Sequence, residues 1–220
     1  MRVDRSFAFI DLCGFTSFTA TRGDDHATSV LASFRSCVRE IASRRGVRIA
    51  KWLGDGAMVV AVEAEPLVAA VIEIERKVED VHSPLPIRAG LSKGAVILFE
   101  GDDYIGTSVN LAARLCDVAG PRQVLAVPAL ADYRPAWVDA GERYPVAIPG
   151  FADPVELIRL LPRAPGPGAV TDPVCGLQLD PEAAIAATDP DGTRRWFCAE
   201  SCASAWADNQ AVAGGSAVGP

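Results

Sequence analysis

The chain has 220 residues, of which 50% are apolar and 22% are charged, so it can bury one domain of about 150 residues and still form a small second module. Its net charge is −7 and it has no run of Lys or Arg long enough to follow a phosphate backbone, which excludes nucleic acid as an expected partner. The apolar stretches 57–62 and 68–74 are far shorter than the ~20 residues that cross a bilayer, and the N-terminus lacks a signal-peptide pattern. We therefore expect no membrane association and a cytoplasmic location.

The first half of the chain alternates β-rich and helical patterns. The pattern predicts a buried strand over 6–12, an amphipathic helix between Asp24 and Gly46, a hairpin of strands 47–53 and 57–62 around Gly54-Asp55-Gly56, a helix over 66–80 and a strand region over 85–100. A third helix follows the loop 101–106, because Val109, Ala112, Ala113 and Cys116 form an apolar stripe. Strand 123–127, a short helix and the runs 144–148 and 155–161 complete this part.

The order β, α, β, β, α, β, with the helices expected on one face, predicts an α+β sandwich of the ferredoxin-like kind. Alternating Pro and Gly over 162–168 can continue neither helix nor strand. We therefore predict a domain over 1–162, a linker over 163–170, a small module over 171–208 and a disordered, Ala/Gly-rich tail over 209–220.

Two acidic residues stand where strands end. Asp11 leaves the first buried strand, and Asp55 lies at the tip of the hairpin. Carboxylates in such places suit hard cations such as Mg²⁺ or Mn²⁺, although Asp is also common in turns as a turn former or cap. The loop after Asp11, formed by Leu12, Cys13, Gly14, Phe15 and Thr16, offers backbone N–H groups that could cradle a phosphate.

Polar residues also occur among apolar ones. Lys51 interrupts the apolar run 49–53, where a charge needs a partner or else lies at an exposed edge. Asn110 and Arg114 are four residues apart on the third helix and so share one face, which by itself is ordinary for a surface helix. Asp103 in the preceding loop directs a carboxylate to the same end of that helix.

These residues lie in four ordered motifs that resemble the class III adenylate and guanylate cyclases. The motifs are F-I-D-L-C-G-F-T from Phe9, K-W-L-G-D-G from Lys51, R-A-G-L from Arg88 with Gly94, and G-D-D-Y-I-G-T-S-V-N-L-A-A-R from Gly101. The resemblance covers about residues 6–161. It implies a homodimer in which each active site is shared between the two protomers.

The resemblance also implies a role for each residue. Asp11 and Asp55 would bind two Mg²⁺ or Mn²⁺ ions per site, Lys51 and Asp103 would read the purine, and Asn110 and Arg114 would serve the transition state. Adenine offers an acceptor at N1 and a donor at its amino group, which suits a Lys and an Asp, so ATP is favoured over GTP. The implied activity is adenylate cyclase.

One position departs from the family pattern. Many relatives have Lys or Arg where this chain has Pro149, which leaves two expectations: weak ATP binding, or substitution by Arg143 or another basic residue. A guanylate or relaxed-specificity cyclase, and a catalytically silent nucleotide-binding dimer acting through its C-terminal module, are the alternatives.

The C-terminal segment has a lone cysteine and then a pair. Cys175, Cys198 and Cys202 resemble the pattern of YHS or TRASH-like treble-clef modules, and three thiolates suit Zn²⁺ or Cu⁺. Asp172, Glu200 or solvent could supply a fourth ligand. Buried cysteines of a small core are the alternative. We hypothesise that metal binding here tunes the cyclase.

Overall fold

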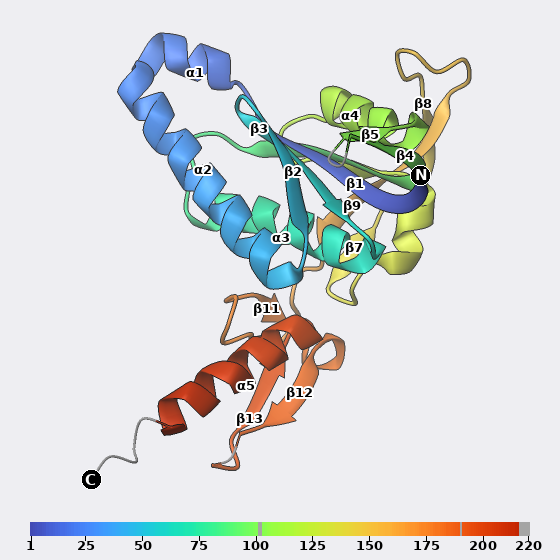
Figure 1. Cartoon of the computed structure of the whole chain (residues 1–220). Helices are drawn as coiled ribbons and strands as arrows, with labels where there is room; N and C mark the ends of the chain where they lie inside the picture. Colours follow the sequence, from blue (N-terminus) through green and yellow to red (C-terminus); the bar gives the residue numbers. More distant parts are fainter. Residues whose placement is uncertain (101–102, 190, 216–220) are drawn as a thin grey trace. The chain divides into compact units, whose positions relative to one another are not determined.

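The computed structural model describes residues 1–100, 103–189 and 191–215, the last five of them as backbone only. The chain divides into two compact units. Unit 1 contains Met1–Arg134 and Val138–Pro162, and unit 2 contains Pro135–Trp137 and the residues from Arg163 onward. Each unit is described by itself (Figure 1). Gly101 and Asp102 of the predicted loop 101–106 lie outside the described residues.

Unit 1 follows the predicted order of elements, with additions. Its elements are β1 (Arg2–Leu12), α1 (Phe15–Arg22), α2 (Asp24–Arg45), β2 (Arg48–Leu53), β3 (Gly56–Ala61), α3 (Ala64–Asp80), β4 (Ile87–Phe99), β5 (Asp103–Ile105), α4 (Thr107–Val118), β6 (Val124–Ala126), the 3-10 helix η1 (Pro128–Tyr133), β7 (Val138–Ala140), β8 (Tyr144–Val146) and β9 (Val155–Pro162). Sequence patterns did not predict α1, β5 or β7. All three are short, and α1 has no buried side chain and hence no apolar stripe to reveal it.

The main sheet of unit 1 runs in the order β2-β3-β1-β4-β6-β9-β7. Its first four strands are antiparallel to their neighbours, and they have the order of the predicted βαββαβ arrangement. β6 joins β4 in parallel, and β9 pairs with β6 in the antiparallel sense. The prediction of an α+β fold is therefore confirmed for unit 1.

Helices cover both faces of this sheet, so the expectation that they lie on one face is wrong. Phe7 of β1 packs against Val109 and Ala112 of α4. Ile10 points to the opposite face, because side chains alternate along a strand, and it is 1% exposed where α3 packs against β1 (Figure 1). The central strands are buried on both sides, which explains why 6–12 is mostly apolar rather than alternating.

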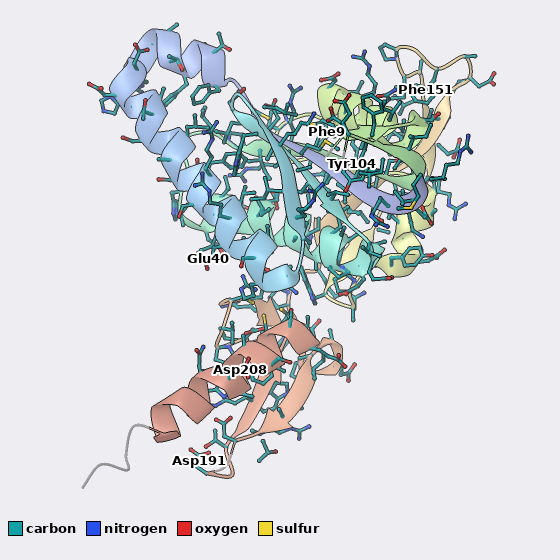
Figure 2. All side chains as sticks on the ribbon, viewed as in Figure 1. Phe9, Glu40, Tyr104, Phe151, Asp191 and Asp208 are labelled. Carbon is teal, nitrogen blue, oxygen red and sulfur yellow. The ribbon has the colours of Figure 1, made fainter. Side chains whose placement is uncertain are left out.

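α4 approaches β4 very closely at Gly90. A Cβ atom there would lie 2.2 Å from the backbone nitrogen of Cys116 and 2.3 Å from the carbonyl oxygen of Ala112. Only glycine fits, which gives a packing reason for the glycine in the R-A-G-L motif. Farther along the same face, Phe9 and Tyr104 pack against the core cluster that contains Phe7 (Figure 2).

Unit 2 is small. Its elements are β10 (Val170–Thr171), β11 (Gln178–Leu179), the 3-10 helix η2 (Pro181–Ala183), β12 (Ile185–Thr188), β13 (Arg194–Phe197) and α5 (Glu200–Gly215). The strands form two hairpins, β10-β11 and β12-β13. Residues 209–215, expected to be disordered, continue α5 because their Ala residues favour helix, and 216–220 lie outside the described residues.

Candidate functional site

Asp11 and Asp55 lie at one end of the central strands. Asp11 is next to last in β1 and pairs with Gly56 of β3, and Asp55 precedes Gly56 in the hairpin turn. A Cβ atom on Gly56 would lie 2.7 Å from the carbonyl oxygen of Ile10 and 3.2 Å from Oδ1 of Asp11. Glycine at this position therefore lets the hairpin approach the end of β1, and both carboxylates reach the same edge of the sheet.

Arg88 joins this pair, and sequence reasoning missed it. It pairs with Asp11 across β1 and β4, and its Nε and Nη2 donate to Oδ2 of Asp11 at 2.9 and 2.8 Å. Its Nη1 donates to the carbonyl oxygen of Asp117 at 3.0 Å. The signal that could have identified it was a charged residue inside an apolar strand, two residues before the motif glycine Gly90. Arg88 fixes the Asp11 carboxylate through one oxygen and leaves Oδ1 outside this ion pair.

The surroundings of Asp55 disfavour its negative charge. Partial burial raises the pKa of Asp55, the negative charge of Asp11 raises it further, and Arg88 and a backbone hydrogen bond oppose the shift. A raised carboxyl pKa means that the surroundings disfavour the ionised form, here first through burial and then through the charge of Asp11. Two hard oxygen donors in this condition fit a divalent ion such as Mg²⁺ or Mn²⁺.

The loop after Asp11 differs in part from the prediction. Leu12 ends β1 with its side chain 1% exposed, and the N–H of Cys13 donates to the carbonyl oxygen of Pro86 at 2.8 Å. The backbone of Cys13 is therefore not free to hold a phosphate, and that part of the prediction is wrong. Gly14 has φ 77° and starts α1, so the N–H groups of Phe15 and Thr16 lie in the first turn of a helix, where they lack intrahelical acceptors.

Lys51 and Asp103 form an ion pair. Lys51 is on β2 and Asp103 begins β5, and both side chains are about half exposed, at 46% and 49%. At this exposure the pair adds little to stability. The two residues that the family resemblance assigned to purine reading are thus neighbours in one protomer.

Asn110 and Arg114 are exposed on α4, on the side away from the buried Val109 and Ala112. Nη1 of Arg114 lies 3.2 Å from Oδ2 of Asp117 in an exposed pair. Among the described residues, no hydrogen bond or ion pair links Asn110 or Arg114 directly to the Asp11–Asp55 edge. Pro149 is exposed before Gly150, which has φ 91° and lies in the turn between β8 and β9.

Unit 2 contains a cluster of three thiols and one carboxylate. The ligand atoms of Asp172, Cys175, Cys198 and Cys202 all lie within 4.8 Å of one another. The Sγ atoms of Cys175 and Cys202 are each 3.6 Å from that of Cys198. Disulfide sulfurs are about 2.05 Å apart, whereas thiolates around a tetrahedral Zn²⁺ at about 2.3 Å are about 3.8 Å apart. The spacing fits a metal, and none of the three cysteines is half of a disulfide.

Asp172 holds the two cysteine-bearing loops together. Its side chain is fully buried, and Oδ1 accepts hydrogen bonds from the backbone N–H groups of Val174 at 2.8 Å and Cys175 at 3.3 Å. Oδ2 accepts one from Cys198 at 2.8 Å. The indole Nε1 of Trp137 donates to the carbonyl oxygen of Cys198 at 3.1 Å. The residue therefore positions the thiols, whether or not it also binds a metal.

Comparisons with known proteins concern mainly unit 1. No family model matches the chain. An uncharacterized protein of Mycobacterium tuberculosis is 36% identical over 152 residues, which are 69% of this chain and 40% of that protein. An adenylate cyclase of Streptomyces coelicolor is 33% identical over 133 residues, 59% of this chain and 34% of that protein. The chain thus spans 40% or less of the length of these curated relatives.

Solved structures show the fold. The adenylyl cyclase CyaB from Pseudomonas aeruginosa has a TM-score of 0.65 and 23% identity, covering 74% of this chain and 96% of that chain. The guanylate cyclase domain of RhGC from Catenaria anguillulae, solved in complex with GTP, has a TM-score of 0.65 and 16% identity, covering 74% of this chain and 100% of its own. Unit 1 has the fold of these cyclase catalytic domains. Within the described part of the chain, no helix is both long and apolar enough to span a bilayer.

Proposed function

We propose that residues 1–162 form a class III nucleotidyl cyclase domain and that the chain converts ATP to 3′,5′-cyclic AMP and pyrophosphate. The observation that carries the proposal is the arrival of Asp11 and Asp55 at one sheet edge in a fold shared with adenylyl and guanylyl cyclases. The Lys51–Asp103 pair supports it, because a donor and an acceptor side by side match the N1 and amino group of adenine.

Asp11 and Asp55 would hold two Mg²⁺ or Mn²⁺ ions, which when bound lower the pKa of the ribose 3′-hydroxyl and offset charge on the triphosphate. The N–H groups at the start of α1 donate to phosphate oxygens, as helix N-termini do. Arg88 orients Asp11 and brings a positive charge to the same edge.

In the reaction the 3′-oxygen attacks the α-phosphorus, the bond from that phosphorus to the bridging oxygen breaks, and pyrophosphate leaves while the hydroxyl proton passes to solvent. Arg114 binds the charge that develops on the α-phosphoryl oxygens, and Asn110 holds the ribose for in-line attack. Both are exposed on α4, and the family resemblance implies that a second copy of the chain brings them to the acids of the first. The active form is therefore a homodimer with shared sites.

Product identity tests this function. Purified full-length chain is incubated with Mn²⁺ and either ATP or GTP, and cyclic AMP from ATP is the expected product. Cyclic GMP would assign a guanylate cyclase, equal products would assign relaxed specificity, and no product from folded protein would point to a silent nucleotide-binding dimer.

Complementation tests the sharing of sites. Asp55→Ala and Arg114→Ala should each be inactive, and mixing the two variants should restore part of the activity, because one site of the mixed dimer keeps all its residues. No recovery after mixing, with dimers present, would show that each chain builds its site alone.

For unit 2 we propose a YHS- or TRASH-like metal module in which Cys175, Cys198 and Cys202 bind Zn²⁺ or Cu⁺ and thereby tune the cyclase. The 3.6 Å sulfur spacing supports it, and soft thiolates would not compete for the hard ions of unit 1. The thiols suit a reducing cytoplasm. Changing all three to Ser should remove the Co²⁺ absorption of the module. Cyclase activity that is the same in the folded triple variant would contradict the regulatory role.

A further inference from the structure

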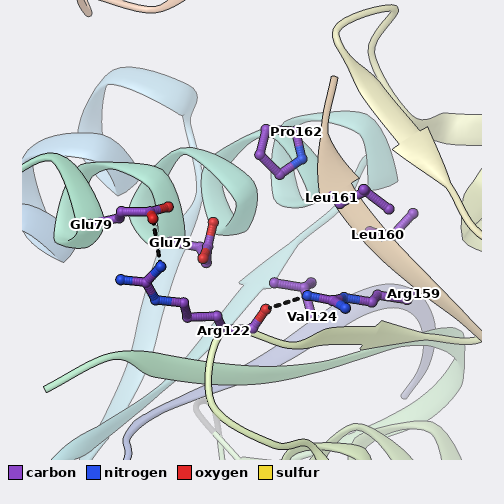
Figure 3. Close-up of a pocket in the computed structure, with 8 residues that line it drawn as sticks. All are labelled: Glu75, Glu79, Arg122, Val124, Arg159, Leu160, Leu161 and Pro162. Carbon is purple, nitrogen blue, oxygen red and sulfur yellow. Dashed lines mark hydrogen bonds and ion pairs between the residues drawn. The ribbon is translucent and has the colours of Figure 1, made fainter. Parts of the chain in front are cut away.

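A pocket of about 260 Å³ lies between α3 and the strands β6 and β9 (Figure 3). Glu75 of α3 lies at its base, and Arg122 and Arg159 lie at its exposed rim. Val124, Leu160 and Pro162 line its apolar part. The cyclase chemistry proposed above uses none of these residues, so the pocket needs its own explanation.

Glu75 is a buried carboxylate without a partner. The residue is only 7% exposed, and among the described residues it has no hydrogen bond and no ion pair. Burial raises the pKa of its carboxyl group, the charge of Glu79 adds to this shift, and Arg122 and Arg159 oppose it. Its carboxylate oxygens are not among the fully buried side-chain atoms that lack a hydrogen-bond partner, so solvent reaches them through the pocket, and a ligand that brings a hydrogen-bond donor or a positive charge could replace that solvent.

Arg159 brings a positive charge to the pocket and, among the described residues, has no carboxylate partner. Its Nη2 donates to the backbone carbonyl oxygen of Arg122 at 3.1 Å, and no carboxylate forms an ion pair with it in the described part of the chain. Arg122 differs, because its Nη1 pairs with Glu79 at 2.6 Å (Figure 3). The pocket therefore contains a carboxylate and a guanidinium that interact electrostatically but, among the described residues, form no ion pair with each other or with another side chain.

The rim is held firmly. Arg122 has φ 59°, an unusual value for a residue other than glycine. Its N–H donates to the carbonyl oxygen of Ile87 at 2.8 Å, and its own carbonyl oxygen accepts the bond from Arg159. These bonds fix the turn and thereby fix the guanidinium of Arg159 at the pocket entrance.

We propose that this pocket binds a small zwitterion with an apolar side chain, of the class of free α-amino acids. The ammonium group pairs with Glu75, the carboxylate pairs with Arg159, and the side chain packs against Val124, Leu160 and Pro162. Ligand pockets for drug-sized molecules occupy about 300–1,000 Å³, so 260 Å³ suits a smaller metabolite rather than a nucleotide.

Isothermal titration calorimetry of the full chain tests this with three matched probes. L-leucine has both charges, 3-methylbutylamine has only the ammonium group, and 4-methylpentanoate has only the carboxylate. Leucine should bind roughly 10-fold tighter than either single-charge probe, because each charged contact contributes separately. Glu75→Gln should weaken leucine and the amine while sparing the acid, and Arg159→Gln should weaken leucine and the acid while sparing the amine.

Glu65→Gln is the matched control, since Glu65 is another partly buried carboxylate on α3 and does not line the pocket. It should leave leucine binding unchanged. Failure of leucine, valine, methionine and phenylalanine to bind at millimolar concentration would overturn the proposal. Equal effects of Glu75→Gln and Glu65→Gln, in variants whose circular dichroism matches the wild type, would overturn it as well, and so would tighter binding of the amine alone.

Discussion

The aspartates of the two units differ in what their oxygens do. Oδ1 of Asp11 stays outside the Arg88 ion pair, and Asp55 is left with a raised pKa. Asp172 of unit 2 is fully buried, and both of its oxygens accept backbone N–H groups. A carboxylate with unfilled acceptor capacity can bind an external ion, whereas one whose oxygens are occupied by the backbone fixes the chain around it. The same side chain is thus suited to ion binding in one unit and to holding the backbone in the other.

The largest expected effect is on activity, at Asp55. Asp55→Ala should abolish measurable cyclase turnover, a fall of at least roughly 10²- to 10³-fold, because the site loses one of its two proposed metal-binding carboxylates. Unfolding stability should not fall, because the change removes a carboxylate that burial and Asp11 disfavour. Cyclic AMP formation and urea unfolding are measured in parallel, with the exposed turn residue changed in Asp153→Ala as control. A large loss of stability would place Asp55 with Asp172 as an architectural residue.

The next effect concerns base choice. Reversing the pair, with Lys51→Glu and Asp103→Lys, keeps an ion pair between β2 and β5 but exchanges donor and acceptor. The kcat/KM for ATP should fall about 10²-fold relative to that for GTP, because two hydrogen bonds to adenine are lost. Both substrates are assayed with Mn²⁺. An unchanged ratio would mean that the pair only joins the two strands.

At Asp172 the expected effect is structural. Asp172→Asn replaces one acceptor oxygen by an N–H donor that faces a backbone N–H, and should destabilise unit 2 by about 1–3 kcal/mol. Hydrogen exchange at the amide of Cys198 should accelerate, whereas the exposed control Asp208→Asn should not change it. Unchanged exchange together with weaker Co²⁺ binding would instead assign Asp172 as a metal ligand.

Glu75 lies between these two cases, since it is buried like Asp172 but has no hydrogen bond or ion pair within the described part of the chain. Its folded-state pKa is raised, so the folded protein gains stability as Glu75 is protonated and loses it as pH rises through that pKa. Glu75→Gln should therefore be more stable than the wild type above that pKa, by about 1 kcal/mol, and lose this advantage at lower pH. Urea unfolding at several pH values, without added amino acids, measures it. An advantage that grows as pH falls would contradict the assignment.

Local patterns predicted much of unit 1 because its helices and strands bury continuous apolar stripes. The segments around Phe34 and Val109 were correctly expected as helices, and Gly54-Asp55-Gly56 was correctly expected as a turn. The face on which α4 packs was not predictable, because it depends on long-range strand order. The hydrogen bond from the N–H of Cys13 to the carbonyl oxygen of Pro86 could not be predicted for the same reason.

The candidate sites were predictable to different degrees. The family resemblance named Asp11, Asp55, Lys51 and Asp103, and the structure brings each pair to one place, although their roles stay predictions. Arg88 was missed because its importance arises from strand register rather than from its neighbours in the sequence. The pocket at Glu75 was also out of reach, since it combines residues from α3, β6 and β9 whose charges look like an ordinary surface pattern.

The Lys51–Asp103 ion pair has a consequence for an incoming nucleotide. With the proposed role, the two side chains satisfy each other in the resting site, so a base has to take over bonds that already exist. When adenine binds, Lys51 and Asp103 exchange their bond to each other for hydrogen bonds to the base, at nearly equal free energy. When guanine binds, they lose their bond to each other and gain none in return. Such an arrangement contributes more to selectivity between the two bases than to binding affinity. Contacts to the triphosphate would then supply most of the affinity.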